Sequence, residues 1–415
     1  MSTGADLQQR LRALIGQSGG SPTTSSTPCA DVADPILARL QRLRGRTRHC
    51  GDQAATAARD AEDDHALARH LGGEVHAPGV IKVERHIAPQ GPLASAGCDG
   101  LADAVAHLLG DSRVRANPCF LDTETTGLAG GTGTVAFLVG LARWEHGELH
   151  VVQLMISAFH GEADMLSAVA ESLGLRAAPA VTYNGRSFDG PLLSARSRLT
   201  HVADPLQDRI HLDLLPFTRR AFVRVYSDCR LATVERELLG VRRVDDLPGW
   251  AAPRAWLDWV RRRRPHDLRR VLAHNLRDLV SLAMLLPVLS SVYRGVPHPA
   301  ADTLGVAGWM VRNHGHHAAR EYLLRHRARL CPDGVAQLAR LARRCGEWEE
   351  AAALWQELAA TGSVEALENL AKYAEHHCKD LAQALTLTDT LIRLQGATAA
   401  HQQRLRRLRG KLERR

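Results

Sequence analysis

The sequence predicts an α/β fold, with a mixed sheet flanked by helices, followed by an all-α region. Segments with strand character alternate with helical segments between about residues 78 and 290, which is typical of an α/β sheet with some antiparallel pairing. From about Ser290 onward the strand signals stop, and two helical segments resemble each other. At 415 residues the chain is long enough for two or three such units.

The folded part is expected to follow a poorly ordered leader, residues 1–72. This leader contains the low-complexity stretch SGGSPTTSSTP, which cannot bury enough apolar surface to become ordered. After the leader we expect a first strand in PGVIKVERHIA, a helix in GLADAVAHLLGD and a strand in NPCFLDTET. Two alternating apolar segments joined by EHGE then predict a β-hairpin. A helix in GEADMLSAVAESLG and a short buried strand in APAVTYN complete the expected sheet region.

The C-terminal region carries an internal repeat. The segments LARRCGEWEEAAALWQEL and AEHHCKDLAQALTLTDTL align with an offset of 33 residues, which pairs Cys345 with Cys378 and Trp348 with Leu381. This offset is close to the period of about 34 residues of TPR helical hairpins. Because two repeats are fewer than such arrays usually need, we expect this tail to pack on the preceding domain.

Composition and charge narrow the class of protein. The chain is 45% hydrophobic and 24% charged, as in soluble globular proteins. Its apolar stretches are shorter than the roughly 20 residues that span a bilayer, and its N-terminus lacks the pattern of a secretory signal. We therefore expect a cytoplasmic protein. The net charge of +8 would suit a polyanionic partner, although a GC-rich coding bias toward arginine would produce the same excess.

Two carboxylates, Asp122 and Glu124, follow the apolar run of the strand in NPCFLDTET. Because side chains alternate across a strand, positions i and i+2 point to the same face. Carboxylates this close repel each other and raise each other's pKa unless a cation lies between them. The pair therefore predicts half of a metal site. The glycines of GLAGGTG either allow a nucleotide to approach the backbone closely or form a tight turn.

A second acidic candidate, Asp189, lies in VTYNGRSFDGPLL, where a strand ends near Asn184 and a helix begins near Phe188. Loops at strand ends are where α/β folds place ligands. An acidic residue in the first turn also stabilises a helix N-terminus, and this simpler interpretation is favoured for Asp189 taken alone.

The third candidate is a long helical pattern, LRRVLAHNLRDLVSLAMLL, which carries His274 and Asp278. These two residues are four apart, so they share one face of the helix, either as members of a site or as an ordinary surface pair. His211 and Asp213 in HLDLLPF are interpreted as structural or substrate-facing rather than as metal ligands.

The order and spacing of these motifs resemble the DEDD exonucleases of the RNase H-like fold. Asp122-Thr123-Glu124 resembles their first motif, Asn184 with Phe188 and Asp189 the second, and His274 with Asp278 the third. Within that group, LDTETTGLAGGTGTVAFLVG, TYNGRSFDGPLL, CRLATVERELLGV and HNLRDLVSLA resemble the YprB-type bacterial proteins. The resemblance covers roughly residues 75–395, and includes the TPR-like tail.

The resemblance implies an RNase H-like exonuclease domain over residues 73–292 and a TPR-like helical domain over 293–415. It implies a metal-dependent nuclease, a 3′-to-5′ exonuclease on single-stranded DNA or RNA, with two Mg²⁺ or Mn²⁺ ions. The implied metal ligands are Asp122, Glu124, Asp189 and Asp278, and His274 is the implied general base. The implied substrate contacts are Thr125, Thr126, Gly127, Asn184, Phe188 and Asn275.

One departure from the better-known exonucleases concerns His274. In their His-type branch the histidine lies five residues before the last aspartate, and in the Tyr-type branch a tyrosine lies four before it. This chain carries a histidine at the tyrosine spacing, so the resemblance does not fix the reach of His274.

A second functional hypothesis is a catalytically weak nucleic-acid-binding adaptor that recruits a protein partner through the TPR-like tail. Four carboxylates and a histidine argue against it, because a binding module has no need to crowd anions. A third hypothesis, a purely helical scaffold, leaves the α/β half of the chain unexplained.

Overall fold

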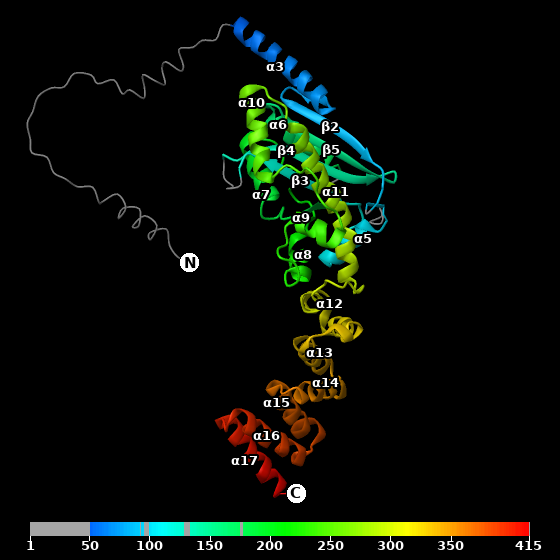
Figure 1. Cartoon of the computed structure of the whole chain (residues 1–415), viewed down its shortest axis with the longest axis vertical. Coiled ribbons are helices and arrows are strands. Elements are labelled where there is room, and N and C mark those ends of the chain that lie inside the picture. Colours follow the sequence, from blue (N-terminus) through cyan, green and yellow to red (C-terminus); the bar gives the residue numbers. More distant parts are fainter. Residues whose placement is uncertain (1–49, 92, 95–98, 128–132, 175–176, 415) are drawn as a thin grey trace, which may run out of the picture. The chain divides into compact units, whose positions relative to one another are not determined.

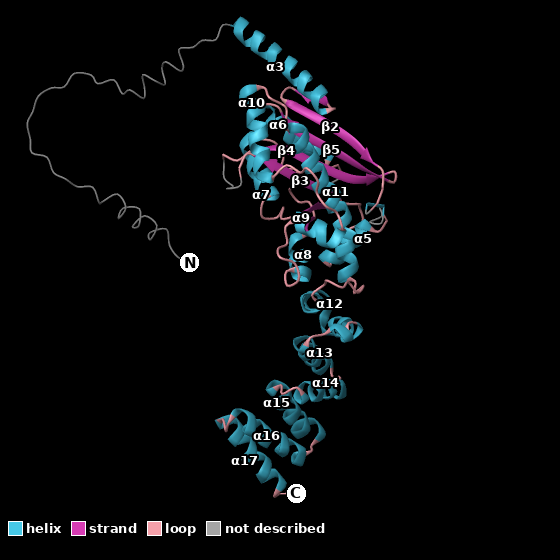
Figure 2. Ribbon diagram, viewed as in Figure 1, coloured by secondary structure: helices cyan, strands magenta, loops and turns pink. Residues whose placement is uncertain are grey.

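The computed structural model describes residues 50–91, 93–94, 99–127, 133–174 and 177–414. Most of the expected leader, 1–49, and most of the glycine-rich loop, 128–132, lie outside these described residues. The described chain confirms the predicted fold class, a mixed sheet with flanking helices followed by a helical region (Figures 1 and 2). The seven strands are β1 (Glu74–Ala77), β2 (Val80–Ile87), β3 (Cys119–Thr125), β4 (Ala136–Glu145), β5 (Glu148–Ile156), β6 (Ala180–Thr182) and β7 (His211–Asp213).

The strands lie in the order β1-β2-β5-β4-β3-β6-β7. In this order, the pairs β1–β2, β2–β5, β5–β4 and β4–β3 are antiparallel, and the pairs β3–β6 and β6–β7 are parallel. The predicted hairpin is confirmed as β4 and β5, which are joined by His146 and Gly147 at φ 50° and 84°. Positive φ at both loop positions gives the turn twist that matches the strands of a tight hairpin. The interior strand β3 therefore has an antiparallel neighbour, β4, along most of its length and a parallel neighbour, β6, at its beginning.

Helices cover the sheet on both faces. Alternation along β3 places Phe120 in a core cluster with α5 and the second half of α11, and Leu121 in another cluster with α6 and α10. The helices of this region are α5 (Leu101–Leu109), α6 (Glu162–Ser172), α7 (Asp189–Thr200), α8 (Leu215–Phe222), α9 (Leu231–Val234), α10 (Ala252–Arg262) and α11 (Leu268–Tyr293). Short turns of helix are η1 (Phe159–Gly161), η2 (Glu235–Leu239) and η3 (Gly249–Ala251).

The end of the expected leader differs from the prediction. Residues Cys50–Leu71 form helix α3, whose last turns bury Leu67 and Leu71 in the core. The buried Asp64 accepts a hydrogen bond from the backbone N–H of Gly79 at 2.8 Å. Burial and this hydrogen bond supply the packing free energy that a poorly ordered segment would lack.

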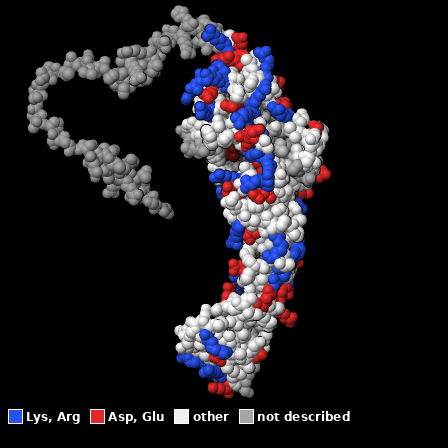
Figure 3. Space-filling model, in the orientation of Figure 1, with Lys and Arg blue, Asp and Glu red and all other residues white. Residues whose placement is uncertain are grey.

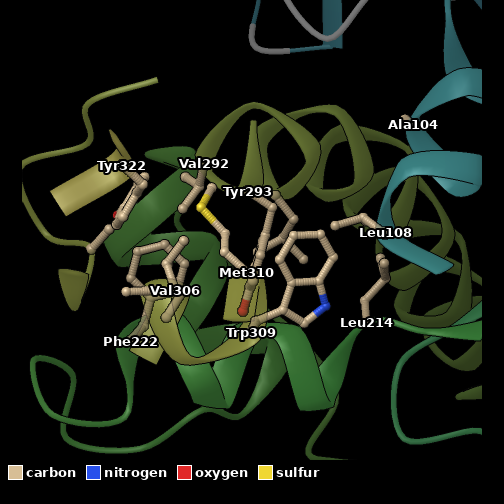
Figure 4. Packing of buried hydrophobic residues seen from close by; sticks show 14 of the residues in the cluster. Ala104, Leu108, Leu214, Phe222, Val292, Tyr293, Val306, Trp309, Met310 and Tyr322 are labelled. Carbon is tan, nitrogen blue, oxygen red and sulfur yellow. The ribbon is translucent and has the colours of Figure 1, made fainter. Parts of the chain in front are cut away.

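Helix α11 carries the third predicted motif and lies against β3, β4 and β5 (Figure 1). Its length and apolar composition would suit a membrane span, and among the described helices it alone has this property. However, 61% of the apolar window is buried inside the protein, which is the pattern of a core helix. Figure 4 shows Tyr293 near its end, packed beside Trp309 of the next helix, α12 (Thr303–Arg325), with their rings 4.8 Å apart.

At the start of the helical region, α12 packs on α8 of the α/β region, while the expected packing of the repeat-bearing part of the tail stays a prediction. The hydroxyl of Tyr293 donates to the carbonyl of Phe217 in α8 at 2.9 Å, and Asp302, which caps α12, donates its backbone N–H to Ala221. The following elements are η4 (Arg327–Arg329), α13 (Pro332–Cys345), α14 (Trp348–Ala360), α15 (Val364–Tyr373), η5 (Ala374–Cys378), α16 (Leu381–Gln395) and α17 (Ala399–Leu412).

The sequence repeat corresponds to a repeat in structure. The pairs α13–α14 and α15–α16 are in contact, and each turn between their helices follows a cysteine, Cys345 or Cys378. Trp348 and Leu381 then begin the second helix of each pair. The 33-residue offset is therefore the spacing of two helical hairpins.

Candidate active site

The carboxylates of the first motif lie in the second half of the interior strand β3. Asp122 pairs in register with Gly140 of β4, which has no side chain to hold α11 away. A Cβ atom built on Gly140 would lie 2.1 Å from Oδ1 of Asn275 on α11. Because of this close approach, Asn275 Nδ2 donates to Asp122 Oδ2 at 2.8 Å.

Asn275 differs from its expected role as a substrate contact. The residue is fully buried, and its Oδ1 accepts a hydrogen bond from Gln153 Nε2 at 2.8 Å. With both ends of its amide bound inside the protein, Asn275 fixes the carboxylate of Asp122 instead of reaching a ligand.

Asp189 begins α7 just beyond the end of β6, and only 5% of it is exposed. The hydroxyl of Thr123 on β3 donates to Asp189 Oδ1, which ties the second motif to the first. Asp189 thus points toward β3 in addition to occupying a first helical turn. The loop before it is held by Asp213, whose carboxylate accepts the backbone N–H of Asn184 at 2.8 Å, in agreement with its structural interpretation.

The third motif reaches the same place from α11. His274 Nε2 lies 3.8 Å from Asp278 Oδ2 on its own helix and 3.9 Å from Glu124 Oε1 on β3. A histidine at the tyrosine spacing therefore does face the carboxylates. The side chains of Glu124, His274 and Asp278 are between 12% and 15% exposed, so the cluster is largely enclosed but still open to solvent.

Enclosure and mutual repulsion shift the pKa values of this carboxylate cluster (Asp122, Glu124, Asp189 and Asp278) upward. Burial raises the pKa of Asp122 well above its ordinary value, and the charges of Asp278, Asp189 and Glu124 add to it. Burial followed by the charges of Asp278 and Asp189 raises the pKa of Glu124 to about 8. Burial raises the pKa of Asp189 to about 6, against the lowering effect of the Thr123 hydrogen bond. Burial also raises the pKa of Asp278. Such a cluster favours either protons or a cation.

The guanidinium group of Arg243 supplies part of the positive charge that the carboxylate cluster favours. Arg243 donates to Asp278 Oδ1, to Asp246 Oδ2 at 2.8 Å and to both carboxylate oxygens of Glu235. Glu235 is 1% exposed and also accepts from the hydroxyl of Ser281 at 2.6 Å. A single cation thus connects Asp278 to two carboxylates that are not part of the predicted motifs.

Asp246 also determines which nitrogen of His274 faces the carboxylate cluster. Its Oδ1 and Oδ2 atoms lie 2.9 and 3.0 Å from His274 Nδ1. Because a carboxylate can only accept, Nδ1 is the nitrogen that carries a proton, and in the neutral form of the ring Nε2 is the nitrogen free to accept one. Hydrogen bonds from Arg243 and His274 outweigh burial and hold the pKa of Asp246 below its ordinary value.

The donor set suits a hard divalent cation. Four carboxylates offer the oxygen ligands that Mg²⁺ and Mn²⁺ prefer. As the side chains lie, however, no group of three or more His, Cys, Asp or Glu among the described residues converges as metal ligands do. The reason is visible in the hydrogen bonds, because Thr123, Asn275 and Arg243 each draw one carboxylate toward a protein donor.

The other expected substrate contacts lie around the end of β3 and in the loop before α7. Thr125 is buried and donates to the carbonyl of Gly127 at 2.9 Å, while Thr126 Oγ1 accepts the backbone N–H of Val135. These two hydroxyls therefore hold the strand end. Asn184 is exposed and Phe188 is half-buried, so both are accessible to a ligand.

Comparison with known proteins shows the family to which the chain belongs. A model of the RNase H superfamily matches residues 119–290, which include the carboxylate cluster and His274. The uncharacterized protein YprB of Bacillus subtilis (strain 168) is 30% identical over 288 residues, which span 66% of this chain and 68% of that protein. The chain is a YprB-like member of the RNase H superfamily. This membership supports a nuclease-like function on nucleic acid, in a superfamily whose nucleases generally use divalent metal ions.

Three functional candidates in this YprB-like protein escaped prediction from the sequence. Glu235, Arg243 and Asp246 come from the segment between α9 and α10. The segment CRLATVERELLGV, which includes Glu235, contributed to the resemblance but gave no indication of a role, and Arg243 and Asp246 lie outside every motif that was singled out.

Proposed function

We propose that this protein is a metal-dependent nuclease of the DEDD type, acting as a 3′-to-5′ exonuclease on single-stranded DNA or RNA in the cytoplasm. The observation that carries the proposal is that β3, α7 and α11 bring Asp122, Glu124, Asp189 and Asp278 into one cluster of interacting carboxylates, with Glu124 and Asp278 beside His274 Nε2. A cluster with so much repulsion costs folding free energy, and a cation-dependent reaction gives it a use.

Asp122, Glu124, Asp189 and Asp278 are the residues that would hold two Mg²⁺ or Mn²⁺ ions. Bound there, the ions would supply charge neutralisation at the phosphate and a lower pKa for an attacking water. Asn275 binds Asp122 Oδ2 and Thr123 binds Asp189 Oδ1, so a bound ion would use the other oxygen of each carboxylate or displace these donors.

His274 is the proposed general base. Its unprotonated Nε2 would accept the proton of the attacking water, while Asp246 stabilises the imidazolium that forms. Arg243 would hold Asp278 and Asp246 at a fixed separation during this step. Thr125, Thr126 and Gly127 would support the strand end, and Asn184 and Phe188 would contact the strand being cleaved.

The test is degradation of single-stranded DNA and RNA labelled at either the 3′ or the 5′ end. We expect stepwise shortening from the 3′ end with Mn²⁺ or Mg²⁺, and no shortening in EDTA or with Asp122→Ala. Asp103→Ala removes an exposed aspartate on α5 and serves as the matched control, with activity like that of the wild type.

Cleavage from the 5′ end or within the strand would support the proposed nuclease activity but overturn the proposed 3′-to-5′ direction. If the wild type cleaves nothing but binds the strands as tightly as Asp122→Ala does, the protein is instead a nucleic-acid-binding adaptor. In that case the TPR-like tail would be the place where a protein partner binds.

A further inference from the structure

The helical tail contains a cavity of about 200 Å³. It lies between α13, α14, α15 and η5, and is therefore built by both helical hairpins of the sequence repeat. Its lining residues are Arg343, Trp348, Trp355, Asn369, Lys372, Tyr373, His376 and His377. This lining combines aromatic rings with basic groups, and it includes no carboxylate.

Three of the rings form an aromatic platform, defined as Trp348, Tyr373 and His377. The ring centroids of Trp348 and Tyr373 lie 6.3 Å apart at 18°, and His377 lies 5.0 Å from Trp348 and 5.2 Å from Tyr373. All three rings are therefore close to parallel. Trp348 and Tyr373 pack on the core with one side, whereas His377 is exposed. The platform therefore lines the cavity with three nearly parallel aromatic rings.

The cations around the platform are available to an anion. Arg343 is exposed and has no ion pair within the described part of the chain. Lys372 pairs with Glu368 at 2.6 Å, but both side chains are more than 40% exposed, so this ion pair contributes little stability and exchanges easily.

A second cavity, of about 360 Å³, extends the surface past His376, which lines both cavities. It is lined by Glu375, His376, Lys379, Leu381, Lys411 and Arg414. Its one carboxylate, Glu375, is buried and already bound to Arg407 and Lys411. Basic side chains therefore predominate in the lining of the second cavity, and Figure 3 shows Lys and Arg, interspersed with Asp and Glu, near the C-terminal end of the chain.

We propose that this part of the tail binds single-stranded nucleic acid. One base would stack on the aromatic platform, and neighbouring phosphates would bind Arg343, Lys372 and the basic groups of the second cavity. Stacking on aromatic rings beside a positively charged groove is how proteins hold unpaired strands without reading their sequence. Binding here does not require cleavage, so it stands independently of the nuclease activity.

The experiment measures binding of a fluorescent oligothymidylate to the full chain in EDTA, where no metal-dependent cleavage occurs. A strand of the same length with abasic sites keeps the phosphates and removes the rings. We expect the wild type to bind the oligothymidylate about tenfold more tightly than the abasic strand, as the loss of a stacked base predicts. The Arg343→Ala/His377→Ala variant should bind both strands almost equally and more weakly.

The matched control is Arg393→Ala/His317→Ala, which removes one exposed arginine and one exposed histidine of the tail outside both cavities. This control should keep the wild-type preference for bases, and circular dichroism should show both variants folded. The absence of a preference for bases in the wild type, or the same loss in both variants, would overturn the proposal. A third result would also overturn the proposal: a polyglutamate peptide displaces the strand, the displacement depends on Arg343, and the bases have no effect on binding. The surface would then fit an acidic protein.

Discussion

His274 Nδ1 lies 2.9 Å from Asp246 Oδ1, while its Nε2 faces Glu124 and Asp278. The two residues come from different parts of the chain, α11 and the segment before α10. Asp246 thereby fixes both the orientation of the His274 ring and the nitrogen that carries its proton. Carboxylates hydrogen-bonded to histidines at metal sites orient those histidines in the same way.

The first prediction tests this orientation with Asp246→Asn. The amide keeps the size of the side chain but removes the charge that stabilises a protonated ring, so we expect nuclease kcat to fall by about tenfold or more. KM for the strand should change little, because Asp246 lies behind the ring. A kinetic comparison with Asp258→Asn, on the outer surface of α10, provides the control. Equal kcat values for the two variants would contradict the orienting role.

The second prediction concerns Asp122→Asn. Burial and neighbouring charges raise the pKa of Asp122, which means that its ionised form destabilises the fold at neutral pH. Asparagine removes this cost and still accepts a hydrogen bond from Asn275, so the metal-free variant should melt at a higher Tm than the wild type.

The same variant should lose its response to metal. Binding of an ion to the native state alone raises stability by an amount that grows with the logarithm of the ion concentration once this exceeds Kd, so Mn²⁺ should raise the Tm of the wild type. The shift should nearly vanish in Asp122→Asn. Thermal scans with Mn²⁺ and with EDTA measure both effects, and an Mn²⁺ shift of wild-type size in the variant would show that the metal binds elsewhere.

Some of this architecture could be predicted from local sequence alone. The β4–β5 hairpin follows from alternating apolar residues around His146 and Gly147, whose backbone requirements are local. The pairing of Asp122 with Glu124 on one face likewise follows from strand alternation, whereas Asp189 and Asp278 were joined to that pair only through the resemblance to known motifs. Such signals extend over only a few residues, so they can be recognised without knowledge of the tertiary structure.

Other features depend on contacts between distant segments. Asn275 on α11 can be buried only because Gly140 has no side chain, and Gly140 lies 135 residues earlier, on strand β4. Charged residues such as Arg243 are usually solvent-exposed, and only the fold shows that this one faces Asp278. Helix α3 was obscured by the low-complexity stretch before it, because the contacts that hold its last turns on the core come from segments distant in the sequence.

The third prediction uses Gly140→Ala. The added methyl group would meet the amide of Asn275, so α11 must shift, with a loss of about 1–3 kcal/mol in the free energy of unfolding. Nuclease activity should fall as well, because the shift moves Asn275 away from Asp122. Chemical denaturation of Gly140→Ala, Asn275→Ala and the double variant measures the coupling. We expect the double variant to lose less than the sum of the two single losses, and strict additivity would exclude the proposed contact.

The last prediction concerns acid sensitivity of the tail. Glu375 is buried, which by itself raises its pKa, but hydrogen bonds from Arg407 and Lys411 outweigh burial and leave the pKa below its ordinary value. A carboxyl group with a lowered folded-state pKa contributes stability that is fully present above its unfolded pKa, about 4.5, and is lost as the pH falls through the folded pKa. Glu375→Gln should therefore destabilise the tail at pH 7, by about 1–3 kcal/mol, and the difference from the wild type should shrink as the pH falls below about 4.5. Denaturation followed by circular dichroism between pH 3 and pH 7 measures this, with the exposed Glu413→Gln on the same helical tail as the control. A destabilisation that is independent of pH would mean that packing around Glu375, and not its charge, holds α17 in place.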